Sequence, residues 1–169
     1  AKGTPTQEAY QAEIKRLQKL VYYDELTGLY NRRGFLEAAQ DIFGAISYKK
    51  SELERRVGFQ IPFSVVFIDI DNFKSINDEF GHEVGDQVLR AAGEALRSHQ
   101  RTSDIYGRLG GEEFVISLVG ADKNVAKAVA ERLRKSLEEI DIEAEGKKID
   151  ITGSFGVITY INEESLEEL

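Results

Sequence analysis

The sequence contains no cysteine, no methionine and no tryptophan, and only two prolines and two histidines among its 169 residues. The absence of cysteine excludes disulfides and thiolate metal sites, and it fits a protein from a reducing compartment. The sequence also has no apolar run long enough to cross a bilayer and no signal-peptide pattern. We therefore expect a cytoplasmic location and no membrane contact by this domain.

Basic residues are in the minority, with 22 Lys and Arg against 30 Asp and Glu, so the net charge is −8. An acidic surface repels the phosphate backbone of DNA and RNA, which argues against a nucleic-acid partner. Hydrophobic residues make up 41% of the sequence, which is ordinary for a globular protein. The length is sufficient for one domain with its own core.

A turn between two strands is predicted by the adjacent glycines Gly110 and Gly111, which allow backbone conformations that a side chain would forbid. Glu112 and Glu113 follow directly, and the β-branched and aromatic residues after them predict a strand. Two carboxylates are therefore expected at the turn of a hairpin. Taken alone, the pair fits equally well a solvated turn that keeps a sheet edge soluble.

A second group of carboxylates follows the buried-strand pattern of residues 63–68, which ends in Asp69-Ile70-Asp71. If this strand and the glycine turn are neighbours, Asp69 and Glu112 converge on one point. Clustered carboxylate oxygens suit Mg²⁺, which prefers hard ligands together with water and substrate phosphate.

Four segments in this order resemble the signature blocks of the GGDEF domain family, with the glycine turn in the GGEEF form. They are residues 24–33, 69–78, 80–86 and 110–114. The resemblance runs from about Asp24 to Tyr160 and implies a diguanylate cyclase, which condenses two GTP into cyclic di-GMP and releases pyrophosphate. It also implies the arrangement shared with nucleotidyl cyclases and polymerase palm domains. The predicted order of helices and strands likewise indicates an α+β fold with a mainly antiparallel central sheet flanked by helices.

The N-terminal residues 1–23 are expected to form a linker and a helix that precede the domain at 24–169. The apolar side chains of this helix recur at alternating spacings of four and three, as in a short coiled coil. They are Tyr10, Ile14, Leu17 and Val21. The stripe fits either a signalling helix that pairs two subunits below an upstream sensor or a helix packed on its own domain. We favour the signalling helix, which is common in the family.

The C-terminal end is expected to depart from the family pattern. The resemblance implies a final helix that carries a lysine and an arginine near the nucleotide phosphates, and we expect this helix to be truncated here. The activity and the stability of the domain would both be affected.

The resemblance implies a two-metal site. Asp69, the Ile70 carbonyl, Glu112 and Glu113 are the expected ligands of Mg²⁺ or Mn²⁺, with two ions per active site. Glu112 and Glu113 both remain candidates for the general base that takes the proton of the attacking 3′ hydroxyl.

Two polar side chains match the guanine base. Asp86 can accept from guanine N1–H and N2–H₂, and Asn77 can serve donor and acceptor positions, whereas adenine would match Asp86 poorly. The resemblance places guanine contacts at these two positions. Taken alone, each residue would more often be a helix cap or a turn residue.

The phosphates are expected at the segment that follows Asp69. Backbone N–H groups of a strand-to-helix turn can hold phosphate oxygens, and Lys74 would add a point charge. Phe73, Gly110 and Gly111 are assigned to the same substrate-binding set, although the Phe73 side chain is expected in the core.

A separate product site is expected at Arg101 and Asp104, which precede Gly110 at the spacing of the family's RxxD inhibitory site. Arg101 can bind guanine O6 and N7, and Asp104 can accept from N1–H and N2–H₂. Either Arg132 or Arg134 would complete the site, and Arg132 is the residue we assign. Cyclic di-GMP bound there would inhibit the enzyme. The ordinary alternative is a surface ion pair of little energetic weight.

Each domain of a diguanylate cyclase would hold one GTP, so catalysis implies a homodimer.

Other functions fit the sequence less well. A catalytically silent module that binds GTP or cyclic di-GMP is the main alternative function. An adenylyl-type cyclase is disfavoured by Asn77 and Asp86, and a purely structural dimerisation domain would not need the acidic cluster.

Overall fold

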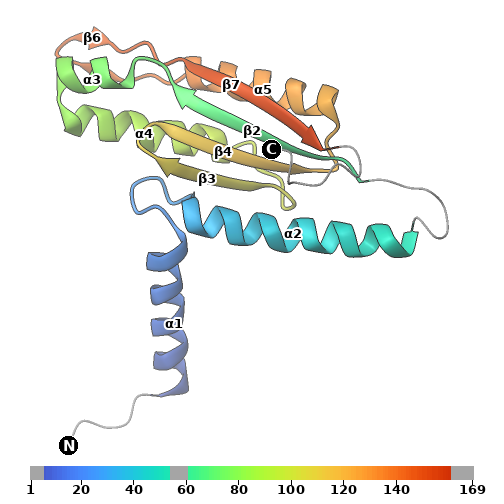
Figure 1. The fold of residues 1–169 in the computed structure, drawn as a ribbon. Helices are drawn as coiled ribbons and strands as arrows, with labels where there is room; N and C mark the ends of the chain where they lie inside the picture. Colours follow the sequence, from blue (N-terminus) through green and yellow to red (C-terminus); the bar gives the residue numbers. More distant parts are fainter. Residues whose placement is uncertain (1–5, 54–60, 161–169) are drawn as a thin grey trace, which may run out of the picture.

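The computed structural model describes residues 6–53 and 61–160, and its centre is a five-stranded sheet in the order β1-β3-β4-β2-β7 (Figure 1). Strand β1 runs parallel to β3, and the other neighbouring pairs are antiparallel. The strands are β1 (Tyr30–Asn31), β2 (Phe63–Ile70), β3 (Ile105–Gly110), β4 (Glu113–Val119) and β7 (Gly153–Tyr160). The predicted α+β fold with a mainly antiparallel sheet is confirmed.

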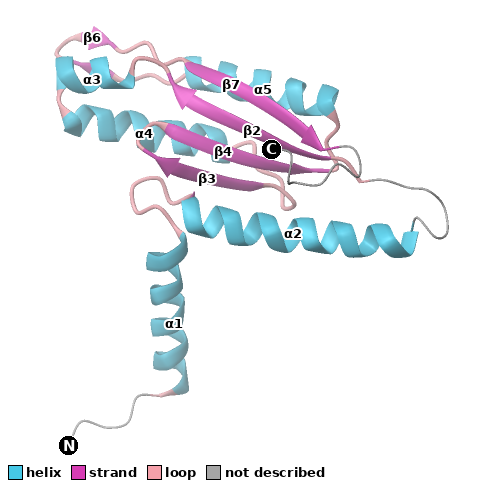
Figure 2. Cartoon of the chain, viewed as in Figure 1, coloured by secondary structure: helices cyan, strands magenta, loops and turns pink. Residues whose placement is uncertain are grey.

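Helices cover both faces of this sheet, as Figure 2 shows with the helices in cyan and the strands in magenta. Helices α4 and α5 lie on one face and α2 lies along the other. A two-stranded hairpin, β5 and β6, follows α5. The remaining elements are α1 (Gln7–Tyr22), α2 (Arg32–Leu53), α3 (Phe73–Phe80), α4 (His82–Arg97), α5 (Lys123–Glu138), β5 (Glu143–Ala144) and β6 (Lys147–Lys148).

Side chains alternate between the two faces of the sheet along β2, and this alternation decides which of them enter the core and which reach the site. Val66, Ile68 and Ile70 are buried under α4 and α5. Because successive side chains point to opposite faces, Phe67 and Asp69 project toward the other face. That face is only partly covered, and Phe67 is 44% exposed. The strand therefore carries its last carboxylate out of the core and into an open region.

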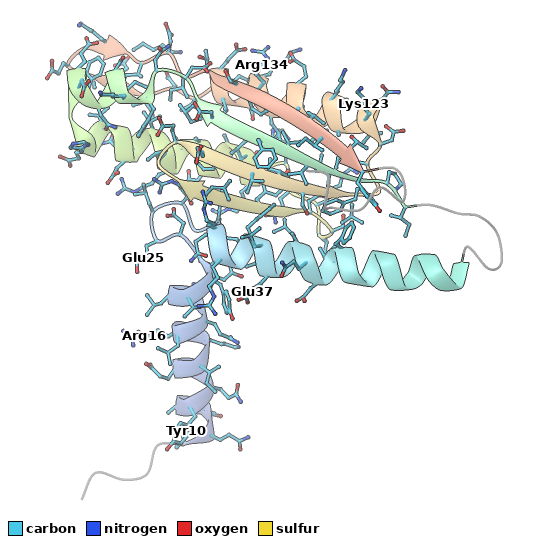
Figure 3. The ribbon with its side chains drawn as sticks, in the orientation of Figure 1. Tyr10, Arg16, Glu25, Glu37, Lys123 and Arg134 are labelled. Carbon is cyan, nitrogen blue, oxygen red and sulfur yellow. The ribbon has the colours of Figure 1, made fainter. Side chains whose placement is uncertain are left out.

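Helix α1 is separate from this core. None of its residues, all of which the structure describes, is buried. In Figure 3 the helix extends away from the sheet, with Tyr10 and Arg16 far from it. The stripe of Tyr10, Ile14, Leu17 and Val21 is exposed along its length. The alternative in which this stripe packs on its own domain is therefore not what the structure shows.

Several elements differ from the prediction. The sequence predicts a short turn-like segment from Asp69 through Lys74, but the chain is helical from Phe73 onward. Strand β1 and the β5–β6 hairpin were not predicted, because two-residue strands contain too little alternation to be recognised. The run from Ile149 to Tyr160 predicts one long strand, whereas strand β7 begins only at Gly153. The expected truncated C-terminal helix lies outside the described residues.

No helix in the part of the chain that the structure describes combines the length and apolar composition needed to span a membrane.

Candidate active site

The glycine turn joins β3 to β4 and carries the two glutamates. Gly110 and Gly111 have φ angles of 147° and 53°, which L side chains rarely adopt, so both positions favour glycine. A register shift between Arg108 and Gly110 interrupts the pairing of the hairpin, and Gly110 then pairs with Glu113. The turn thus requires the residues that identified it in the sequence.

Strand β2 brings Asp69 to this turn. Asp69 pairs with Glu113 of β4 in register, and the Ile70 N–H donates to the Glu112 carbonyl at 3.3 Å. Asp69 and Glu113 are exposed, and Glu112 is half-buried. The predicted proximity of β2 to the glycine turn is confirmed, although Glu113 rather than Glu112 stands directly opposite Asp69.

The carboxylates of this cluster repel one another. Partial burial, together with the negative charges of Glu112, Glu113 and Asp71, raises the pKa of the Asp69 carboxyl above its ordinary value. This is the effect that neighbouring like charges have on an acid. A bound cation would relieve the repulsion.

The oxygens present here fit a hard divalent cation. Among residues 6–53 and 61–160, no three His, Cys, Asp or Glu side chains are already gathered around one point as metal ligands. Asp69, the Ile70 carbonyl, Glu112 and Glu113 instead offer a small set of oxygen donors at one edge of the sheet. Mg²⁺ uses such sets, because it binds one or two carboxylates and takes its other ligands from water and substrate phosphates.

The N-terminus of α3 faces solvent directly after this cluster. Asn72 adopts the left-handed conformation with φ of 57° at the N-cap, and its side chain makes no capping hydrogen bond. The first N–H groups of a helix are a favourable site for phosphate oxygens. Lys74 is exposed beside them, whereas the Phe73 side chain is buried in the core. Only the backbone of Phe73 is therefore available to a nucleotide.

Helices α3 and α4 bring the two guanine candidates together. A Cβ atom on Gly85 would lie 2.0 Å from Asn77 Oδ1 and 3.2 Å from Phe73 Cζ, so the close contact depends on this glycine. Asp86 follows Gly85 directly, and its side chain is 50% exposed. Its ion pair with Arg90 is long, at 3.9 Å. Asn77 and Asp86 thus lie near one another, and the Asp86 carboxylate remains accessible.

Arg101 and Asp104 lie in the turn before β3, at the opposite end of this strand from Gly110. β3 has six residues, so the two ends are roughly 17 Å apart. Asp104 is buried and accepts from the Arg101 backbone N–H at 3.4 Å and from the Ser103 hydroxyl at 3.2 Å. The expected separation of the product candidates from the glutamates is present.

The buried Tyr106 side chain lies within reach of the charges of both this turn and Arg132. Burial and the negative charge of Asp104 raise the pKa of Tyr106 to about 12, and the charges of Arg132 and Arg101 oppose this shift. All three candidates therefore lie within electrostatic range of one buried ring. Arg134 instead pairs with Glu131 and Glu138 on its own helix. The charge of Arg132 thus acts on the same ring as the charge of Arg101.

The sequence reasoning missed an ion pair that holds the glycine turn in place. Arg108 Nη1 lies 3.1 Å from both Asp24 carboxylate oxygens, and Arg108 Nε donates to the Gly111 carbonyl at 2.9 Å. The two side chains are 13% and 24% exposed. Asp24 also accepts from the Thr27 N–H and hydroxyl at 2.9 and 2.7 Å. The Asp-x-x-Thr spacing indicates such a turn, but nothing in the sequence indicates a partner 84 residues away.

This ion pair affects the protonation of Asp24. Burial alone would raise the pKa of the carboxyl, but the hydrogen bonds from Thr27 and Arg108 outweigh it and lower the pKa below its ordinary value. Asp24 is therefore ionised at neutral pH and anchors Arg108.

Comparison with known proteins agrees with this geometry. Residues 21–169 match the family model described as "Diguanylate cyclase, GGDEF domain". Diguanylate cyclase VdcA of Vibrio cholerae is 36% identical over 160 residues, which cover 93% of this chain and 43% of that protein. Cyclic di-GMP phosphodiesterase NbdA of Pseudomonas aeruginosa is 36% identical over 154 residues, which cover 90% of this chain and 18% of that protein.

A solved structure agrees as well. Diguanylate cyclase SiaD of Pseudomonas aeruginosa, in complex with its activator SiaC, superimposes with a TM-score of 0.72 at 31% identity over 96% of this chain and 58% of that one. This chain spans less than half the length of the two curated relatives named above. By the family model, by these relatives and by its fold, the chain belongs to the diguanylate cyclase GGDEF domain family.

Proposed function

We propose that this chain is a catalytic domain that condenses two GTP into cyclic di-GMP and releases pyrophosphate. The observation that carries the proposal is the facing of Asp69 and Glu113 across β2 and β4, with Glu112 beside them on the glycine turn. A binding module would not need mutually repelling carboxylates next to an open helix N-terminus.

The substrate would lie between this cluster and the pair formed by α3 and α4. The N–H groups at the start of α3 would hold phosphate oxygens, with Lys74 as an added positive charge. Asp86 would accept from guanine N1–H and N2–H₂, and Asn77 would bind beside it. The net charge of −8 repels a triphosphate in general, so these local contacts must supply the binding.

Asp69, the Ile70 carbonyl, Glu112 and Glu113 would hold two divalent cations, Mg²⁺ or Mn²⁺. Such ions neutralise charge at the reacting phosphate and lower the pKa of the attacking 3′ hydroxyl. Glu112 or Glu113 would accept the proton of that hydroxyl. The chain's own contribution is to hold these groups at fixed positions on two paired strands and a rigid turn.

The reaction requires two copies of the domain. Each copy holds one GTP, and the product has two-fold symmetry, so two active sites must face one another. The exposed stripe on α1 is suited to pair with the same stripe of a second chain. An upstream sensor in the full-length protein would then control catalysis through this helix.

Product inhibition would use the opposite end of β3. Arg101 and Asp104 would bind one guanine of cyclic di-GMP, with Arg132 nearby. Because the product has two guanines, it could link this turn to an arginine of another domain. Occupation would hold two active sites apart without competing with GTP.

A second candidate function is binding of GTP or cyclic di-GMP without turnover. It is favoured by one observation, that the described residues contain no ready-made cluster of three acidic metal ligands. Incubation of the purified chain with GTP and either Mg²⁺ or Mn²⁺, followed by separation of the nucleotides, distinguishes the two functions. Cyclic di-GMP and pyrophosphate support the cyclase, whereas bound but unchanged GTP supports the binding module.

A further inference from the structure

Asp71 has a role that differs from those of its acidic neighbours. Its Oδ1 accepts from the Ser154 hydroxyl at 2.7 Å, and its Oδ2 accepts from the Thr152 hydroxyl at 2.8 Å. The Asp71 N–H also donates to the Thr152 carbonyl at 3.0 Å. We call these three residues, Asp71, Thr152 and Ser154, the Asp71 clamp.

The clamp lies where the chain leaves the sheet and enters α3. Asp71 follows the last residue of β2, and Asn72 adopts its left-handed conformation next, with no side-chain cap on the helix. A left-handed asparagine is tolerated but not favoured, so the surrounding contacts must hold it. The clamp makes three hydrogen bonds between Asp71, which directly precedes Asn72, and the residues Thr152 and Ser154 at the beginning of β7.

The connection to the site is short on both sides. The Ile70 carbonyl and Asp69 immediately precede Asp71, and Ser154 pairs with Asp69 in register. The N-terminus of α3 follows Asn72. A displacement of Asp71 would therefore move the carboxylate cluster and the helix N-terminus relative to each other.

We propose that Asp71 is a positioning residue, which acts through hydrogen bonds to Thr152 and Ser154 and sets the spacing between the acidic cluster and the start of α3. Each of its two carboxylate oxygens accepts from a hydroxyl group, one of Ser154 and one of Thr152, which is the contact that a positioning role requires. This inference rests on the proposed function for the identity of the nucleotide, GTP. It assigns to β7 a part in the site that its sequence does not reveal.

Hydrogen-bonding capacity and charge can be separated by substitution. In Asp71→Asn the charge is lost, but the amide can still accept from one hydroxyl and donate to the oxygen of the other. In Asp71→Ala both bonds are lost. In the double variant Thr152→Val/Ser154→Ala both bonds are lost while the Asp71 charge remains.

Affinity for GTP and turnover are both measured on the purified 169-residue chain. Affinity is taken from calorimetric titration with a GTP analogue that has an α,β-methylene linkage, so it does not depend on activity. Asp71→Ala and the double variant are expected to weaken binding at least about tenfold, because the start of α3 is no longer held in alignment with the phosphates. Asp71→Asn is expected to stay within about threefold of the parent.

A matched control is Thr159→Val on the same strand. Thr159 also has a bonded hydroxyl, 2.8 Å from Ser64 Oγ, but it lies at the far end of β7. The unfolding temperature of Thr159→Val shows how much of a loss of affinity comes from lower stability alone. The affinity of this control for the analogue should equal that of the parent.

The opposite pattern would overturn the inference. If Asp71→Asn weakens binding as strongly as Asp71→Ala while the double variant binds normally, the charge rather than the clamp is required. If the parent binds the analogue but forms no cyclic di-GMP, the proposed function fails while the clamp is still tested by affinity. Normal binding by all three variants would mean that the clamp is dispensable.

Discussion

The two ends of strand β3 differ in the charges that they offer to a phosphate-containing nucleotide. At the Gly110 end, carboxylates repel one another and raise the pKa of Asp69, so a phosphate can bind only together with cations and helix N–H groups. At the other end, Arg101 and Arg132 accompany a single buried aspartate, Asp104, so an anionic ligand meets positive charge directly. Under the proposed function, the first end would carry the chemistry at a phosphate, and the second would bind the finished product.

Under the proposed function, one short strand would serve catalysis at one end and product binding at the other, with different residues for each. The glycine turn requires φ values of 147° and 53° and is held by the ion pair of Arg108 with Asp24. The other turn is held by hydrogen bonds to Asp104 from its own neighbours. Changes at one end should therefore leave the other intact.

The largest effect is expected from loss of the carboxylates. Asp69→Asn or Glu112→Gln should lower the rate of cyclic di-GMP formation at least about 100-fold, because each removes negative charge that would stabilise bound cations. The rate is measured by nucleotide separation. The folded state should remain, since Asp69 is exposed and its neighbours repel it. Near-normal rates in both variants would remove these residues from the site.

Nucleotide selectivity is expected to be the next largest effect. GTP should be preferred over ATP by about 100-fold in kcat/KM, because adenine leaves the groups at Asn77 and Asp86 unmatched. Competition between the two nucleotides measures this ratio. Asp86→Ala should reduce the preference, and equal use of both by the parent chain would contradict the guanine assignment.

Product binding should depend on Arg101. Arg101→Ala should weaken cyclic di-GMP binding by about 1–3 kcal/mol, the cost of losing a bidentate contact to guanine, and it should relieve inhibition. Calorimetry measures the affinity. Arg134→Ala is the matched control, because Arg134 pairs with acidic residues of its own helix. If Arg101→Ala and Arg134→Ala bind product equally, the turn at 101–104 is only structural.

The smallest effect concerns pH and the Asp24–Arg108 ion pair. The pKa of Asp24 is lower in the folded chain than when unfolded, so its stabilisation is complete above the unfolded pKa and is lost as pH falls through the lower, folded value. Asp24→Asn should therefore reduce the free energy of unfolding by about 1–2 kcal/mol at pH 7. Denaturant titrations at pH 7 and in acid measure this. The gap between variant and parent should close as the pH falls, and a constant gap would exclude the ion pair as its cause.

Much of the fold and the outline of the site could be predicted from the sequence. Buried strands with strong alternation and paired glycines carry local signals, so β2, β4 and the glycine turn were expected together. The sequence predicts that Asp69 and Glu112 converge, and the charge of Glu112 does act on the Asp69 carboxyl. The residue directly opposite Asp69 on β4 is Glu113, which could not be predicted because the register of two strands is set only when they pair. The roles of Asp24 and Asp71 were not found, since their partners lie 84 and about 80 residues away and such pairs arise only from the folded sheet.

The most direct test of the account is a calorimetric titration of cyclic di-GMP into the Asp69→Asn variant. If the two ends of β3 act independently, this variant loses turnover but binds the product with the affinity of the parent chain. The same titration with Arg101→Ala should show weakened binding. A parallel loss of product affinity in Asp69→Asn would contradict the account, because it would place product and substrate in one shared site.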